Sequence, residues 1–147
     1  MALRHPLYGE ACKEILSDVV KGVIEAYGSI LTPIEIFGSL SEINANIAAG
    51  AVDSYFSLPI RMSSIDEGAI RVAIMIAVSS GVTYDSVHAS VMYKERISTI
   101  ITEDVKHWRR IENQWLPTAE KIRINVPGLE LVRPLNYQLW KSGIRRR

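Results

Sequence analysis

The stretch Gly81–Asp104, GVTYDSVHASVMYKERISTIITED, constrains the fold more than any other part of the chain. Asp85 stands near the start of a predicted helix whose apolar residues recur at helical spacing. The β-branched run 99–101 is too short for a helix and predicts a short buried strand. Asp104 follows the carboxyl end of that strand, which is the edge of an α/β sheet where chemistry collects.

Size and composition bound the class of protein. The 147 residues are enough for one domain with a core, and 48% hydrophobic residues exclude a disordered chain. A net charge of +1 gives no global attraction to nucleic acid, so any such attraction needs a local basic patch. The single Cys12 fits a reducing compartment, and the longest apolar run, 72–78, is far short of a membrane span. We expect a cytoplasmic protein without a membrane partner.

Apolar periodicity predicts helices before this stretch at 6–26, from Thr32 to Gly50, and at 66–78. Thr32 is the expected N-cap of the second helix, and Gly50 either ends it or kinks it into a further helix through Tyr55 and Phe56. Asp66 is the expected cap of the helix at 66–78. The faces predicted to be buried are Ile34, Phe37, Leu40, Ile43 and Ile47 in the second helix and Ile70, Ala73, Ile74, Ala77 and Val78 in the helix at 66–78.

Strands are predicted at 29–31, 99–101 and 122–126, with a further extended segment at 58–62. A short helix is expected from Asp104 to Ile111, and no element is assigned to 129–147. Strands separated by helical segments predict an α/β fold, with a short parallel sheet flanked by helices.

Three carboxylates stand near the ends of predicted elements: Glu35, Asp85 and Asp104. Oxygen ligands of this kind hold Mg²⁺ or Mn²⁺, which stabilise the charge that develops on phosphate during hydrolysis. Each residue also has a structural interpretation. Glu35 completes a capping box with Thr32, Asp85 favours the dipole of its helix, and Asp104 caps the helix that follows.

Basic and aromatic residues allow two interpretations as well. Lys106, Arg109 and Arg110 follow Asp104 and form either a phosphate-binding cluster or a solvated helix face. The three tryptophans are expected in the core or in an interface more than in base stacking. The sequence contains no P-loop, dinucleotide fingerprint, zinc-ligand spacing or G-x-S-x-G motif.

The order of these pieces resembles that of the PIN-domain ribonucleases, and in particular of the VapC-like toxins. Residues 83–89, TYDSVHA, are similar to the family's D-A-x-H-A helix start, and 100–104, IITED, to its strand that ends in Ser/Thr-x-Asp. Similarity extends to the family's first helix start, Glu-led second element and last strand, at 5–8 (HPLY), 32–36 (TPIEI) and 122–127 (IRINVP). We therefore expect a PIN-like domain at 1–128 and a C-terminal tail at 129–147.

The resemblance implies a three-layer PIN-like domain and a metal-dependent endoribonuclease of the kind that acts as the toxin of a toxin–antitoxin pair. Glu35, Asp85 and Asp104 would bind Mg²⁺ or Mn²⁺, Thr102 would orient water or phosphate, and His88 would pack or hydrogen-bond. RNA would be the substrate. A homodimer and an antitoxin protein would be the partners, bound at an apolar groove near residues 55–58.

The chain departs from the family's pattern at its start. The family opens with a central strand that ends in an Asp ligand, and no room for it precedes the HPLY motif. The resemblance therefore implies an N-terminally truncated domain, from a late start or a trimmed chain. Alternatively, the protein is a non-catalytic PIN-like interaction protein with a degenerate metal site. In a third account, residues 129–132 fill the vacant strand position and bring Glu130 toward the site.

Overall fold

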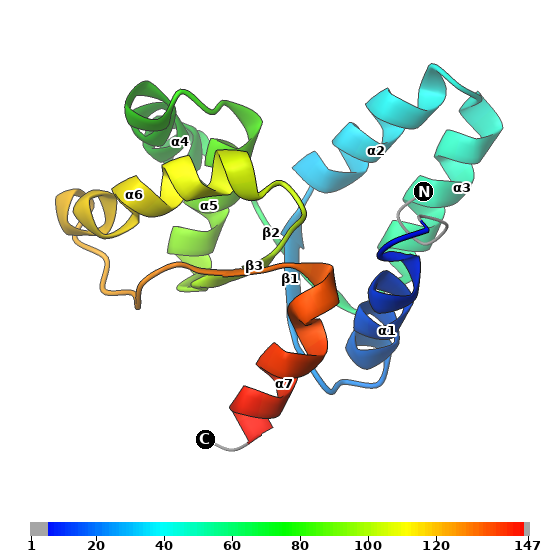
Figure 1. Ribbon diagram of the computed structural model, residues 1–147. Coiled ribbons are helices and arrows are strands. Elements are labelled where there is room, and N and C mark those ends of the chain that lie inside the picture. The colour runs from blue at the N-terminus through cyan, green and yellow to red at the C-terminus, as the bar shows by residue number, and fades with distance from the viewer. Residues whose placement is uncertain (1–5, 146–147) are drawn as a thin grey trace.

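A computed structural model describes residues 6–145 (Figure 1). His5 of the HPLY motif and the region before it lie outside the described residues. The elements in chain order are α1 (Gly9–Val20), β1 (Ala26–Ser29), α2 (Leu31–Ser41), α3 (Ala45–Ser57), β2 (Ile60–Ser63), α4 (Glu67–Ser80), α5 (Tyr84–Glu95), β3 (Thr99–Ile101), α6 (Val105–Lys121), β4 (Glu130–Val132), the 3-10 helix η2 (Pro134–Asn136) and α7 (Tyr137–Arg145).

The boundaries around α4, α5 and β3 confirm the sequence predictions. The Asp66 carboxylate accepts a hydrogen bond of 2.8 Å from the Ala69 amide and so caps α4. Gly81 ends α4 in the left-handed conformation at φ +72°, which glycine adopts without strain. β3 spans the predicted residues, and α5 begins one residue before Asp85.

The predicted second helix is wrong in its end and in its cap, whereas the further helix through Tyr55 and Phe56 is confirmed as part of α3. The predicted second helix is divided into α2 and α3 because the Asn44 side chain accepts hydrogen bonds from two following amides and begins a new helix. Gly50 lies inside α3 and does not end a helix. Thr32 lies inside α2, whose N-cap position is Ile30, and no side-chain hydrogen bond caps this helix. The predicted capping box therefore does not form.

The strand predicted at 122–126 is also wrong. α6 continues through Pro117 to Lys121, well past the predicted end at Ile111, and an extended coil follows it. Val126 is buried in this coil, and Ile122 and Ile124 pack against the core. Apolar residues therefore alternate with polar ones here although no strand forms. The strand lies farther along the chain, at β4.

The four strands form two parallel pairs and not a single sheet. β1 pairs with β2 in the register Ala26↔Ile60, and β3 pairs with β4 in the register Thr99↔Glu130. Figure 1 shows α4, α5 and α6 gathered on one side of the strands, and the α2–α3 hairpin with α1 on the other. The fold is thus α/β with parallel strands flanked by helices, as predicted.

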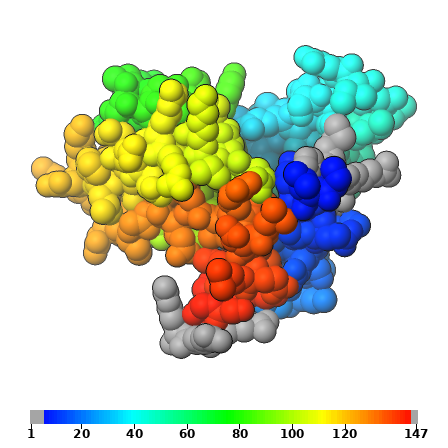
Figure 2. Space-filling view, viewed as in Figure 1, coloured from blue at the N-terminus to red at the C-terminus, as the bar shows by residue number. Residues whose placement is uncertain are grey.

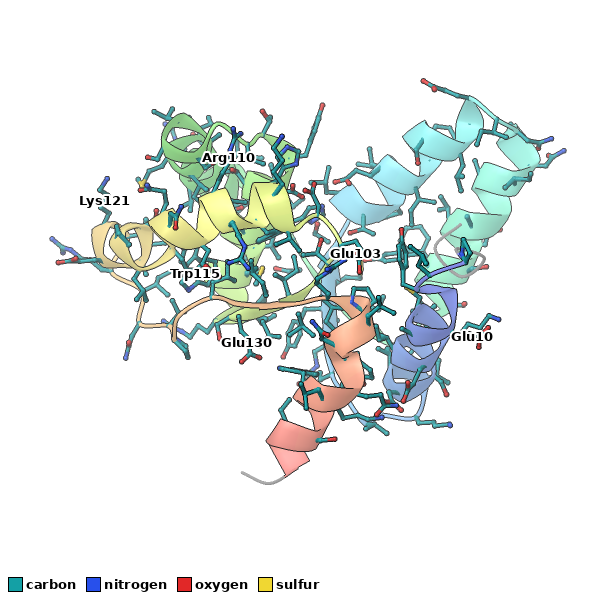
Figure 3. The ribbon with its side chains drawn as sticks, viewed as in Figure 1. Glu10, Glu103, Arg110, Trp115, Lys121 and Glu130 are labelled. Carbon is teal, nitrogen blue, oxygen red and sulfur yellow. The ribbon has the colours of Figure 1, made fainter. Side chains whose placement is uncertain are left out.

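The hydrophobic core lies within the α4–α6 half of the molecule. Trp108 and Trp115 are 2% and 1% exposed, as expected for core tryptophans, and Tyr93 stacks on Trp115 with ring centroids 4.0 Å apart. Figure 3 shows Trp115 on the side of α6 that faces the coil before β4, with Arg110 on the opposite side toward α4. The Trp115 indole donates a hydrogen bond of 2.8 Å to the Pro127 carbonyl and so holds that coil on the core.

The predicted buried faces of two helices are largely exposed. Phe37 is 56% exposed, and Val78, the most exposed residue of the predicted α4 face, is 81% exposed. Only Leu40 of the predicted α2 face and Ala73 of the predicted α4 face are among the buried core residues. The exposed members of the two faces are Ile34, Phe37, Ile43, Ile47, Ile70, Ile74 and Val78. Figure 2 shows the α2–α3 hairpin projecting from the remainder of the molecule, which leaves its outer surface uncovered.

The C-terminal residues, to which the sequence assigned no element, are fixed to the first helix. The Lys141 ammonium contacts the Asp18 carboxylate at 2.6 Å, and the Tyr137 hydroxyl donates to the same carboxylate at 2.7 Å. The hydrogen bond from Lys141 has the largest effect on the pKa of Asp18, followed by the one from Tyr137, and both hold that pKa below its usual range. Among the described residues, no helix is both long and apolar enough to span a membrane.

Candidate metal centre

Two carboxylates and an imidazole meet where β3 ends. Asp85 is in the first turn of α5, Asp104 is the N-cap of α6, and His107 follows in the first turn of α6. One ligand atom from each of the three lies within 4.8 Å of those of the other two. The packing of α5 against α6 brings the two helix starts together, so residues 19 positions apart share one site.

His107 bridges the two carboxylates. Its Nδ1 lies 2.7 Å from Asp104 Oδ2 and 3.8 Å from Asp85 Oδ2. Asp104 Oδ1 accepts a hydrogen bond of 3.3 Å from the His107 amide. Asp104 therefore caps α6, as its structural interpretation predicts. The cap uses Oδ1 and leaves Oδ2 for the imidazole or a cation.

The electrostatic environment of Asp85 is that of a half-buried acid beside other acids. Burial raises the pKa of the Asp85 carboxyl, and the Asp104 carboxylate raises it further. His88 and His107 lower it in part, and Glu35 adds a smaller increase. A carboxylate disfavoured in this way gains from a positive charge beside it, which is what a divalent cation would supply.

Glu35 lies near this group without joining it. Its Oε1 is 2.8 Å from His88 Nε2, so the carboxylate is held by an imidazole of α5. The charge of Glu35 still reaches Asp85, which places the start of α2 beside the site. Among the described residues, the structure groups Asp85 and Asp104 with His107, and it pairs Glu35 with His88.

Thr102 supports the backbone of the site. Its Oγ1 accepts a hydrogen bond of 3.0 Å from the Asp104 amide, two residues along the chain. This local turn fixes the direction in which Asp104 leaves β3. Thr102 therefore acts on the position of Asp104 in the structure, and its expected role toward water or phosphate remains a prediction.

His107 is the site residue that sequence reasoning missed. The sequence signal was its position three residues after Asp104, because residues i and i+3 at a helix start lie on the same side. The basic residues of 104–111 are the more prominent feature of this segment in the sequence. Its imidazole is 47% exposed, so a cation can reach it from solvent.

The donor set fits a divalent cation of the first transition row. Two carboxylates suit Mg²⁺ and Mn²⁺, whereas an imidazole nitrogen is a ligand for transition metals more than for Mg²⁺. The partial exposure of all three side chains leaves room for water and a substrate oxygen. We expect Mn²⁺ to bind more tightly than Mg²⁺.

The basic residues of α6 are close in sequence and exposed. Lys106, Arg109 and Arg110 all face solvent, and Arg109 Nη1 lies 3.8 Å from the Glu112 carboxylate. The Arg110 guanidinium approaches Gly81, at the connection that leads into α5. Cations therefore surround the first half of α6 on the side away from the core.

We predict that Mn²⁺ affinity depends on the ionisation of Asp85. Because its pKa is raised, protonation competes with the cation at a higher pH than for an ordinary aspartate. In His107→Gln, which has no imidazole ligand to titrate, calorimetric titration from pH 8 downward should show affinity falling at a higher pH than an ordinary aspartate ligand would give. Asp53→Asn in the same background, which removes an exposed carboxylate of α3 outside the site, should leave this profile unchanged. A fall confined to the pH range of ordinary aspartates would contradict the prediction.

No protein-family model, no curated protein and no solved structure matches this chain. The chemistry assigned to the site therefore depends on the side chains described above.

Proposed function

We propose that this protein is a metal-dependent endoribonuclease of the PIN/VapC-like type, built on a three-layer PIN-like domain and working in the cytoplasm. The observation that carries the proposal is the meeting of Asp85, Asp104 and His107 at the carboxyl end of β3. The order of the motifs around them, from Glu35 to Asp104, supports the same reading. Mg²⁺ or Mn²⁺ would be the cofactor.

Asp85 and Asp104 would hold the cation through carboxylate oxygens, and His107 through Nδ1. A divalent cation there supplies Lewis-acid stabilisation of the negative charge that develops on a phosphodiester during hydrolysis. Thr102 fixes the Asp104 backbone, and His88 keeps the Glu35 carboxylate beside the site. Glu35 is then placed to accept a proton or to bind a second cation.

RNA is the proposed substrate because the site lies beside exposed cations. Lys106, Arg109 and Arg110 would contact phosphates on either side of the scissile bond, which positions a strand without reading its sequence. With a net charge of +1, the chain has no global field, so these local contacts would supply the attraction.

The uncovered apolar surfaces of α2, α3 and α4 support the proposed partners. Monomeric proteins rarely expose large contiguous apolar patches, and here one lies on the packed pair α2 and α3 and another on α4, across the strands. Phe37, Phe56 and Val78 are each more than half exposed. We propose that a second copy of the chain and an antitoxin protein cover these surfaces, as the apolar segment near residues 55–58 indicates.

A cleavage assay tests the nuclease proposal. We expect the chain to cut single-stranded RNA in the presence of Mn²⁺ and not in the presence of a chelator. Asp104→Asn should reduce the rate by at least about a hundredfold, because one ligand and its charge are lost. His107→Gln should reduce the rate with Mn²⁺ more than the rate with Mg²⁺. Cleavage that survives both changes would contradict the proposal, whereas Asp53→Asn should behave as the parent chain.

The second candidate is a non-catalytic interaction protein on the same scaffold. The exposed apolar residues of α2, α3 and α4 favour it, because binding surfaces alone would explain them. It predicts a stable dimer or complex and no cleavage with any divalent cation. Specific cleavage that depends on Asp104 would exclude it.

A further inference from the structure

A cavity of about 630 Å³ separates the two pairs of strands. All four residues of β1 and all three residues of β3 line it. Among the described residues, none from β2 or β4 does. The order across the molecule is therefore β2, β1, cavity, β3, β4.

The cavity lies beside the edges of the strands and not over a face. Successive side chains of a strand point to opposite faces, so a cavity over one face would contact alternate residues. This cavity contacts consecutive residues of both strands, 26–29 and 99–101. On their cavity side, β1 and β3 have no strand partner within residues 6–145. Each thus presents unpaired N–H and C=O groups to the same space.

Both edges have their carboxyl ends at the same end of the cavity. β1 leads into α2, and β3 leads to Asp104. Thr32, just after β1, and Thr102, just after β3, line the cavity together with Asp85, so the carboxyl ends of both strands lie toward the metal centre. A segment that lay between them parallel to both would end beside Asp85.

The walls of the cavity are mostly apolar, although the acids Glu25 and Asp85 also line it. Their aliphatic residues come from α1, α5 and the strands: Ile15, Val19, Val91, Met92, Ile100 and Ile101. β3 is half-buried at every residue, although its sequence is entirely β-branched. A strand with partners on both sides would be covered, so these residues have the composition of a central strand and the exposure of an edge.

We propose that this cavity binds an extended peptide segment from another chain, which pairs with β1 and β3 at once. The occupant is parallel to both strands, carries apolar side chains, and has its carboxyl end at the metal centre. A helix has no free backbone groups to offer and an apolar small molecule has none at all, so neither would satisfy both edges. An extended strand alone supplies donors and acceptors along its two sides, as in β-augmentation.

Amide exchange measured by NMR tests this proposal without metal or RNA. The probes are nine-residue peptides with five varied β-branched or aliphatic residues between terminal lysine pairs. We expect at least one peptide to slow exchange about tenfold or more in both 26–29 and 99–101, because new hydrogen bonds form there. A copy of that peptide N-methylated at alternate residues, which removes donors from one side, should lose the effect.

Matched variants locate the binding. Ile101→Lys places a charge in the cavity and should weaken peptide binding about tenfold or more. Met62→Lys places the same charge on β2, outside the cavity, and should leave binding unchanged. Slowing in only one of the two strands, or in neither at millimolar peptide, would overturn the proposal. Because the readout involves no catalysis, its failure is distinct from failure of the nuclease assignment.

Discussion

Asp85→Asn should weaken Mn²⁺ binding at least about tenfold and slow RNA cleavage, while leaving the protein as stable as the parent chain, or more stable. Burial and the Asp104 carboxylate raise the pKa of Asp85, so the folded protein holds the ionised form at a cost. A group with a raised folded-state pKa contributes stability below its unfolded pKa and loses it as pH rises through the folded pKa. At neutral pH the asparagine therefore removes a penalty.

The measurement is calorimetric Mn²⁺ titration together with thermal unfolding at pH 7. We expect binding weakened at least tenfold and a melting temperature equal to that of the parent or a few degrees higher. The gain in melting temperature should shrink as pH falls, because Asp85 of the parent then becomes protonated as well. Asp53→Asn is the control for loss of a carboxylate outside the site. Binding equal to the parent would exclude Asp85 as a ligand, and a large loss of stability would contradict the electrostatic argument.

Trp115→Ala should cause the largest loss of stability of any single substitution considered. The indole is 1% exposed, stacks on Tyr93 at 4.0 Å, and donates to the Pro127 carbonyl. The Tyr93 hydroxyl in turn donates to the Trp115 carbonyl at 2.6 Å. Removing a buried tryptophan costs about 3–5 kcal/mol, a large part of the roughly 5–15 kcal/mol that stabilises a typical domain.

Urea unfolding followed by circular dichroism measures this effect. The matched control is Trp140→Ala, because Trp140 is only half-buried and its indole donates to the Glu130 side chain near the surface. Its midpoint should fall less than that of Trp115→Ala. Equal losses for the two variants would mean that the core does not centre on α6.

Local sequence signals correctly predicted the elements that begin or end at a capping residue, a glycine or a β-branched run. The Asp66 cap, the Gly81 stop and the β-branched run of β3 each act within a few residues, so their positions follow from the sequence alone. The break at Asn44 is of the same kind. The apolar periodicity continues across Asn44, and this continuity conceals the new helix start.

The features that the sequence did not predict depend on packing between elements distant in the chain. Residues 122–126 alternate in polarity because a coil lies along the core, and no local rule separates that pattern from a strand. The faces of α2 and α4 were expected to be buried because apolar periodicity indicates a covered face without indicating what covers it. In the site, Asp85 and Asp104 were found from their places at element ends. The place of His107 three residues after Asp104 is a local signal, but only the packing of α5 on α6 shows that this turn also approaches Asp85.

The attachment of α7 to α1 has a consequence for how the chain reaches its fold. Lys141 and Asp18 are 123 positions apart, so their contact closes a loop that includes nearly the whole sequence. The entropic cost of closing such a loop rises only slowly with its length. The chain loses this entropy before the contact between Lys141 and Asp18 stabilises the fold. During synthesis α1 is made before α7, so α1 lacks this contact until α7 is complete. The α4–α6 core, whose contacts are nearer in sequence, can form in the meantime.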